Sequence, residues 1–384
     1  MRIATGISTE RHPGAAAHEA AGAAARGLGG ERAELAVMFA SGDHLADPEP
    51  LLAAVHAELE PEAVLGCGAG GVLADRRELE SGTALAIWAA ALEGGSARPF
   101  HAAAGEPDAG APAGLPDLPA NSALIMLCDP YSFAADAALE WLAGHAPGVP
   151  VLGGLASASG TGGEAVLFAG DAVLPGGAVG VCLEGVELLP CVSQGAAPMG
   201  PEMTITASEG NVIHQLAGRP ALDAIERAVS ALAPAQRALV ASGLLIGIVI
   251  DGGKPEYEQG DFLVRGVLGA DRDSGAVAVG TSVVPGQVVR LHARDARSAD
   301  EDLRRALALR ARAIGGQPAA GALVFSCNGR GATMFGERDH DAMAVADELH
   351  GAPAAGFFAA GEIGPVGGRS FLHGFTATVA VFPR

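Results

Sequence analysis

Two polar loops near the end of the chain combine residue types that could bind a small charged molecule. The first, SCNGRG, follows the apolar run ALVF, and the second, GEIGP, follows the apolar run GFFAA. In the first loop Cys327 offers a thiol, Asn328 a donor and an acceptor, and Arg330 a planar fork that fits a carboxylate. The second loop contributes Gly361 and the carboxylate of Glu362. Arg330 and Glu362 together would suit a zwitterion, which carries one carboxylate and one ammonium group.

The two loops should lie side by side. The apolar runs before them predict parallel strands within residues 321–331 and 355–365, and right-handed β-α-β connections usually make such strands neighbours. The alternative is that Arg330 and Glu362 pair only with each other, as a surface ion pair worth about 0–1 kcal/mol. If they recognise a ligand, Arg330→Ala should cost about 1.5–3 kcal/mol of binding and barely change stability.

Cys327 leaves a catalytic alternative open. A nucleophilic thiol needs a depressed pKa, which a nearby cation or a helix N-terminus can provide. Arg330 could be that cation, but the sequence places no base beside it, and His373 is taken as the candidate base in the same stretch. We therefore expect binding without catalysis and keep an enzyme with Cys327 as nucleophile as an alternative.

Metal and cofactor sites are not expected. Asp43-His44 and Asp339-His340-Asp341 have ligand types, but adjacent residues rarely face one ion, and acids at a helix start favour the helix dipole as surface residues. The five cysteines are scattered singly without a C-x-x-C motif, which argues against structural zinc and a disulfide framework. The stretch GCGAGG at 66–71 matches G-x-G-x-x-G, but no clear helix follows it. A tight turn in which glycine permits positive φ is the simpler interpretation.

The predicted strands and helices that would position these loops form a repeated pattern. Three stretches, beginning near Leu35, Leu124 and Ala322, each show an apolar run, a helical segment, a second apolar run with a Gly-rich end and a third apolar run. This order predicts an α/β fold of two related domains, with mixed β-sheets covered by helices and built from an internally repeated β-α-β-β unit. The boundary is predicted near residue 200, which gives domains of 1–200 and 201–384.

Composition limits the partners. With 24 Lys and Arg against 44 Asp and Glu, the net charge is −20, and Lys254 is the single lysine. Such a surface repels phosphate backbones, so nucleic-acid binding is not expected. The apolar runs are too short to span a bilayer and the N-terminus lacks a signal-peptide pattern, which predicts a cytoplasmic protein without membrane insertion.

Several of these stretches resemble a known family. ALVFSCNGRG, AAGFFAAGEIGP and FLHGFTATVAVF resemble the FIST C-domain, and LAVMFASGDH, VLGCGAGGV, PVLGGLAS and GAVGVCL resemble the FIST N-domain. The junction that contains Gln194 and the stretch DFLVRGVLGAD that contains Arg265 also resemble this family. Relatives often carry Cys-Arg after Ser-Gln-Gly, whereas Ala196-Ala197 stands here.

The resemblance implies an intracellular sensory protein that binds a small ligand, with an amino acid as one candidate. It adds Gln194 and Arg265 to the candidate ligand-binding residues. A sensor of this kind would signal through a separate protein. A protein-interaction scaffold, which would expose an apolar patch in place of an enclosed pocket, is a further alternative.

Overall fold

The chain forms two compact units, each described here by itself. The computed structural model describes residues 1–103, 113–158, 160 and 163–384. The first unit comprises Met1–Val192, Leu303–Leu372 and Ala377–Arg384, and the second comprises Ser193–Asp302 and His373–Thr376. The predicted boundary near residue 200 falls within β14 (Ala196–Glu209) of the second unit. The predicted domains, 1–200 and 201–384, stay a prediction.

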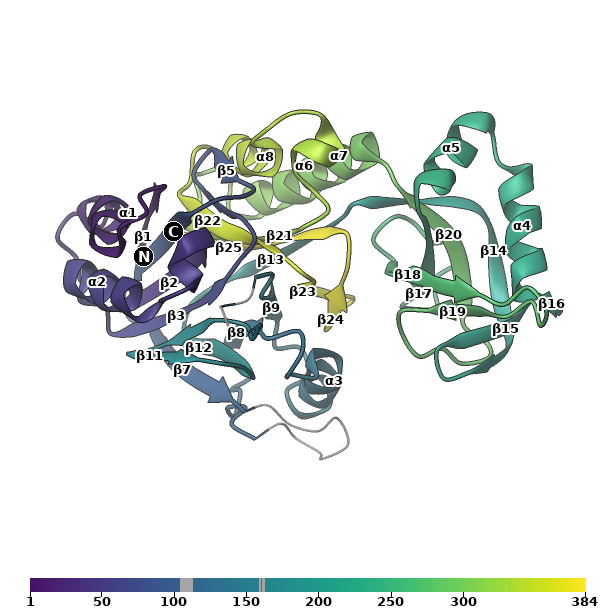
Figure 1. Cartoon of the computed structure of the whole chain (residues 1–384), viewed down its shortest axis with the longest axis horizontal. Helices are drawn as coiled ribbons and strands as arrows, with labels where there is room; N and C mark the ends of the chain where they lie inside the picture. Colours follow the sequence, from purple (N-terminus) through teal and green to yellow (C-terminus); the bar gives the residue numbers. More distant parts are fainter. Residues whose placement is uncertain (104–112, 159, 161–162) are drawn as a thin grey trace. The chain divides into compact units, whose positions relative to one another are not determined.

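The first unit contains three six-stranded sheets that share one order of strands. Figure 1 labels strands of each of them. The first sheet has the order β1 (Arg2–Ser8), β6 (Ala84–Ala91), β2 (Leu35–Ser41), β3 (Ala63–Gly68), β10 (Leu167–Ala169), β11 (Ala172–Leu174). The second has the order β7 (Ser96–Ala102), β12 (Ala178–Glu184), β8 (Ser122–Cys128), β9 (Val151–Leu155), β23 (Glu362–Val366), β24 (Arg369–His373). The third has the order β13 (Leu189–Gln194), β25 (Thr376–Phe382), β21 (Gly321–Cys327), β22 (Ala354–Ala359), β4 (Val72–Ala74), β5 (Arg77–Leu79).

Each sheet mixes parallel and antiparallel pairs. The central pairs β2–β3, β8–β9 and β21–β22 are parallel, and the strand on one side of each pair is antiparallel to it. The predicted α/β class with mixed sheets is therefore confirmed. The common strand order agrees with the three similar stretches in the sequence, while their origin by internal duplication stays a prediction.

The β-hairpins are exchanged between the sheets. β4–β5 follows β3 of the first sheet in the sequence but pairs with β22 of the third, and β10–β11 follows β9 of the second but pairs with β3 of the first. β23–β24 follows β22 of the third sheet and pairs with β9 of the second. Each sheet is thus completed by a hairpin that follows, in the sequence, a strand of another sheet. The three sheets therefore depend on one another for their full set of hydrogen bonds.

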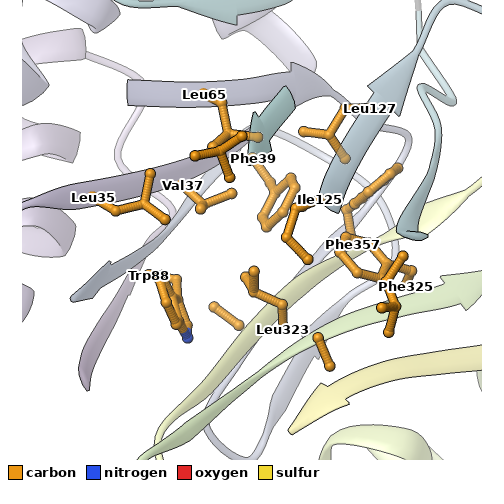
Figure 2. Close-up of a cluster of buried hydrophobic side chains, with 14 of the residues drawn as sticks. Leu35, Val37, Phe39, Leu65, Trp88, Ile125, Leu127, Leu323, Phe325 and Phe357 are labelled. Carbon is orange, nitrogen blue, oxygen red and sulfur yellow. The ribbon is translucent and has the colours of Figure 1, made fainter. Parts of the chain in front are cut away.

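A shared core lies between the three sheets. Alternate side chains of the central strands point inward and meet there, as Figure 2 shows for Phe39, Ile125, Phe325 and Phe357. The rings of Phe39 and Phe357, from the first and third sheets, stack with centroids 4.9 Å apart. A large apolar side chain that is fully buried contributes about 1.5–3 kcal/mol, so this core stabilises the three sheets together.

Helices cover the outer face of each sheet, which explains why the central strands are apolar on both faces. They are α1 (Pro13–Gly27) and α2 (Glu49–Leu59) on the first sheet, α3 (Ala135–His145) on the second, and α6 (Ala296–Ala313) and α8 (His340–Glu348) on the third. α7 (Ala332–Phe335) is a single turn before α8. Across the described residues, no helix is both long and apolar enough to cross a membrane.

The second unit is a closed antiparallel barrel. Its strands follow the order β14-β20-β17-β18-β19-β15-β16, and a further pairing of β14 with β15 closes the ring. The strands other than β14 are β15 (Val212–Leu216), β16 (Arg219–Pro220), β17 (Leu244–Val249), β18 (Phe262–Ala270), β19 (Val277–Val279) and β20 (Val288–Arg294). α4 (Ala221–Ala231) and α5 (Pro234–Ser242) complete this unit.

Candidate functional site

The two predicted loops meet at the carboxyl edge of the third sheet. β21 and β22 are parallel neighbours, with Cys327 opposite Ala359 at their ends. The amide of Asn328 donates to the carbonyl of Ala359 over 2.9 Å, which fixes the first loop beside the second. The predicted adjacency of these strands is confirmed. Among the candidates here, Asn328 is exposed, whereas Cys327 is 9% exposed.

Arg330 is held in a buried ion pair with Asp341. Its Nε and Nη2 donate to the two carboxylate oxygens over 2.6 and 2.8 Å, in the bidentate geometry that arginine favours. Arg330 is 2% exposed and Asp341 is 1% exposed. Ser326 Oγ donates to the same carboxylate over 2.7 Å, and Nδ1 of His340 lies 2.9 Å from it. The third guanidinium nitrogen, Nη1 of Arg330, is buried and has no hydrogen-bond partner among the residues that the structure describes.

The pairing fixes the charge states. Burial alone would raise the pKa of Asp341, but the charge and hydrogen bonds of Arg330, with those of His340 and Ser326, hold it well below its usual range. Burial alone would lower the pKa of Arg330, but the charge of Asp341, followed by Cys327 and Glu362, raises it. Both groups are therefore ionised at neutral pH, and most of the positive charge of Arg330 is balanced inside the protein.

Phe335 packs over this pair. Its ring stacks on that of His340, with centroids 3.4 Å apart and an angle of 7° between the planes. The guanidinium carbon of Arg330 lies 5.1 Å from the centre of the same ring. Such a cation–π contact is stronger when the cation is desolvated, as it is here. The segment that includes α7 thus covers the ion pair.

Glu362 is buried at a position where the corresponding hairpins carry apolar residues. It is 0% exposed, begins β23, and is close enough to Arg330 to influence its pKa. Leu167 begins the corresponding hairpin, β10–β11. It pairs with Cys67 of β3 in the same way as Glu362 pairs with Gly154 of β9, so the two residues occupy the same position in their sheets. The third hairpin, β4–β5, begins with Val72. The hairpins of the first and third sheets therefore begin with an apolar residue, whereas β23 of the second sheet begins with a buried glutamate.

The hairpin β4–β5 brings two further acidic residues to this site. Oε1 of Glu78 accepts a hydrogen bond from the amide of Ala342 at the start of α8 over 2.9 Å. Oε1 of Glu80 accepts one from the amide of Ala332 at the start of α7 over 2.9 Å. Burial, followed by the charge of Asp341, raises the pKa of Glu78 to about 7. The exchange of hairpins thus places residues of the first stretch against the loops of the third.

Comparison with known proteins identifies the family. The family model of the FIST N domain matches residues 34–219, and that of the FIST C domain matches residues 221–365. The chain belongs to the FIST family. It is 44% identical over 384 residues to the "Uncharacterized protein Rv0628c" of Mycobacterium tuberculosis (strain ATCC 25618 / H37Rv), with 100% of both chains covered. It is 41% identical over 384 residues to the "Uncharacterized protein Mb0898c" of Mycobacterium bovis (strain ATCC BAA-935 / AF2122/97), covering 100% of this chain and 99% of that protein.

The predicted resemblance to FIST domains is therefore confirmed. FIST domains are associated with sensing and signal transduction. Arg330 and Glu362 lie within the residues matched by the FIST C domain, as does Arg265, whereas Gln194 lies within those matched by the FIST N domain.

Gln194 and Arg265 belong to the second unit of this FIST protein. Gln194 is buried and its side chain is used inside that unit. Its Nε2 donates to the carbonyl of Phe262 over 2.5 Å, and its Oε1 accepts from the amide of Gly260 over 3.2 Å. Arg265 is 8% exposed and donates to the carbonyl of Val264 over 3.1 Å. The five other candidates lie at or just after the ends of the parallel strands β21 and β22. Glu362 begins β23 of the second sheet, and the backbone carbonyl of Gly361 accepts from the amide of Leu155 in that sheet.

Two predictions about motifs need correction in this FIST protein. Asp339 and Asp341 do stand at the start of α8, but Asp341 is buried against Arg330 because the apolar face of that helix begins there. The glycines of the G-x-G-x-x-G stretch do not have positive φ. Gly66 lies within β3, where a Cβ atom would come 2.1 Å from the carbonyl oxygen of Met38, so close approach of strands explains this glycine. The stretch continues into β4 and not into a helix.

The remaining groups considered are the types of residue that bind metals, and the cysteines. The part of the chain that the structure describes holds no group of three or more His, Cys, Asp or Glu that could bind a metal ion. All five cysteines are buried thiols. Sequence reasoning missed Asp341, Glu78 and Phe335 as parts of the site. Of these three, only Asp341 could have been found from the sequence, because it stands between polar residues and the apolar run of α8.

Proposed function

We propose that this FIST protein binds a small molecule at the carboxyl edge of the third sheet, with an amino acid as the first candidate, and that binding is its sensory event. The observation that carries the proposal is Nη1 of Arg330, a buried donor without a partner. An unsatisfied buried donor costs about 1–3 kcal/mol, and more when it is charged, so a ligand carboxylate that accepts from it is stabilised. Glu362 is proposed to bind the ammonium group of the ligand, because a buried carboxylate favours such a group.

The position of Glu362 strengthens this reasoning. Leu167 and Val72 show that the corresponding hairpins begin with apolar side chains. A carboxyl group costs free energy to bury, so its presence where the related hairpins carry apolar side chains supports a role in binding. Asn328 is exposed beside it and offers both a donor and an acceptor to a ligand.

The two alternatives have less support. A nucleophilic Cys327 would need the charge of Arg330 to stabilise its thiolate, but Asp341 already balances that charge through two hydrogen bonds. A scaffold should expose a contiguous apolar patch. Among the described residues, the large apolar side chains that are exposed come from four separate segments; they are Tyr131, Leu268, Val284 and Leu309. We further propose a cytoplasmic location and a separate signalling partner.

A thermal-shift screen tests the proposal. The purified chain is heated with amino acids and related metabolites, each also assayed with Glu362→Gln. A ligand at about a hundred times its Kd adds about 2.7 kcal/mol to stability, which is readily seen. The proposal expects a ligand that stabilises the wild type and shifts Glu362→Gln less. A ligand that stabilises both proteins equally would place binding elsewhere.

A further inference from the structure

The end of β5 holds the segment that covers the candidate site. Besides its bond to the amide of Ala342, Glu78 donates its own amide to Oδ1 of Asp339 over 2.6 Å. Glu80 accepts from the amide of Ala332. The segment 331–342, which contains α7 and the first turn of α8, is thus fastened to β5 by three hydrogen bonds. Two of them are made by glutamate side chains.

The fastened segment has the backbone features of a movable cover. Gly331 and Gly336 have φ of 90° and 75°, and Asp339 has φ of 63°, so left-handed residues stand at both ends and in the middle. Between them, Phe335 contacts both Arg330 and His340. A Cβ atom at Gly331 would lie 2.8 Å from the carboxylate of Glu80, so that glycine also permits the close approach of β5. Phe335 thus places this segment over the guanidinium whose Nη1 the proposed ligand would reach.

Glu78 is the one of the two glutamates whose charge is disfavoured by its surroundings. It is 7% exposed, and its Oε2 is buried and accepts no hydrogen bond from the described part of the chain. The charged groups that act on it are Asp341 of α8 and Glu80 of its own strand end, both negative, and Arg330 and His340 contact Asp341 in turn. The amides of Ala342 and Asp341 favour the ionised form but do not outweigh burial and Asp341.

We propose that Glu78 is a proton-operated latch, which holds the segment 331–342 over Arg330 while it is protonated and releases it when it ionises. The latch regulates the ligand site proposed above, so its role in sensing rests on that proposed function. The latch itself is a property of the protein without ligand.

The direction of the pH effect follows from linkage. In the closed segment the pKa of Glu78 is about 7, whereas an exposed glutamate has its ordinary value of 4.5. The closed form therefore binds the proton more tightly than the open form, and raising the pH above 4.5 favours opening until the pH passes 7. From about pH 6 to about pH 8 the opening equilibrium should rise about tenfold.

Hydrogen–deuterium exchange, measured by mass spectrometry on the full chain, tests this inference. Protection factors, which correct for intrinsic exchange at each pH, are compared for peptides that cover residues 331–342. In the wild type, protection should fall about tenfold from about pH 6 to about pH 8. Glu78→Gln cannot ionise, so its protection should not depend on pH. Glu80→Gln is the matched control, which removes a neighbouring carboxylate and should keep the pH dependence.

The outcomes separate the latch from the ligand proposal. Protection that is independent of pH in the wild type, or that rises with pH, would overturn the latch even if the thermal-shift screen finds a ligand. Equal pH dependence in the wild type and Glu78→Gln would overturn it too. The expected exchange pattern without any ligand in the screen would keep the latch and remove the proposed function.

Discussion

Breaking the ion pair of Arg330 and Asp341 should destabilise the first unit strongly. The expectation from sequence, that Arg330→Ala would barely change stability, assumed a surface pair. The pair is instead 2% and 1% exposed, with bidentate hydrogen bonds of 2.6 and 2.8 Å. Arg330→Met keeps much of the side-chain volume and removes the charge. The change leaves a buried carboxylate without its cation.

The expected magnitude follows from burial and from the partners that remain. Removing one member of a buried ion pair typically costs about 3–5 kcal/mol. After Arg330→Met, Asp341 still accepts from Ser326 and still contacts His340, which favours the lower end, about 3 kcal/mol. Asp341→Asn should cost a similar amount, since it leaves the guanidinium charge buried. The double variant buries no unpaired charge, so its cost should fall short of the sum by at least about 2 kcal/mol.

Urea denaturation followed by tryptophan fluorescence measures this cycle, because Trp88 and Trp141 both belong to the first unit. Arg32 and Glu62 are the control pair, an exposed ion pair of the same unit with 2.6 Å between the charged groups. Arg32→Met should change stability by no more than about 0.5 kcal/mol. If Arg330→Met cost as little as Arg32→Met, or if the two single changes were additive, the buried pair would not have the role given to it here.

Three further predictions concern other parts of the chain. Burial lowers the pKa of His292 to about 4. The free energy of unfolding of the second unit should therefore fall by up to about 3 kcal/mol as the pH falls from about 6.5 to 4. His292→Phe should remove this pH dependence, as measured by calorimetric unfolding. Gly356→Ala would place Cβ 1.8 Å from the carbonyl oxygen of Val324 and should cost at least about 3 kcal/mol in denaturation, whereas Gly144→Ala, in open space on a helix, should be neutral or stabilising. Cys327 should not react faster than the other thiols with a mild electrophile at neutral pH, and selective labelling with ester turnover would revive the enzyme alternative.

Local patterns sufficed for the central elements of the fold. Apolar runs such as ALVF and GFFAA predicted β21 and β22 as parallel neighbours, which the structure confirms. These strands could be predicted because strands buried on both faces leave strong composition signals. The proximity of the residues that follow β21 and β22 is a direct consequence of this pairing, as the hydrogen bond from the amide of Asn328 to the carbonyl of Ala359 shows. The role of Cys327, Asn328, Arg330 and Glu362 in binding stays a prediction.

Long-range pairing could not be predicted in the same way. β4–β5 consists of three-residue strands, and nothing in Val72–Ala74 indicates pairing with Ala355–Phe357 instead of its sequence neighbours. Glu78 therefore gave no sign that it would reach α8. Asp341 looked like a surface acid because its burial depends on Arg330, eleven residues earlier in the chain and folded over it. In each case the decisive contact joins residues whose proximity only the tertiary structure creates.

The central claim is that Glu362 and the buried donor of Arg330 recognise a ligand at the third sheet. Calorimetric titration tests it most directly, with the ligand found in the thermal-shift screen and with wild type, Glu362→Gln and Asp43→Asn. Asp43 is an exposed acid in the loop after β2, the corresponding strand of the first sheet, and serves as the matched control. We predict that Glu362→Gln weakens binding by about 1.5–3 kcal/mol, the range for a hydrogen bond to a charged group, while Asp43→Asn binds as the wild type does. Equal affinities in all three proteins would contradict the claim.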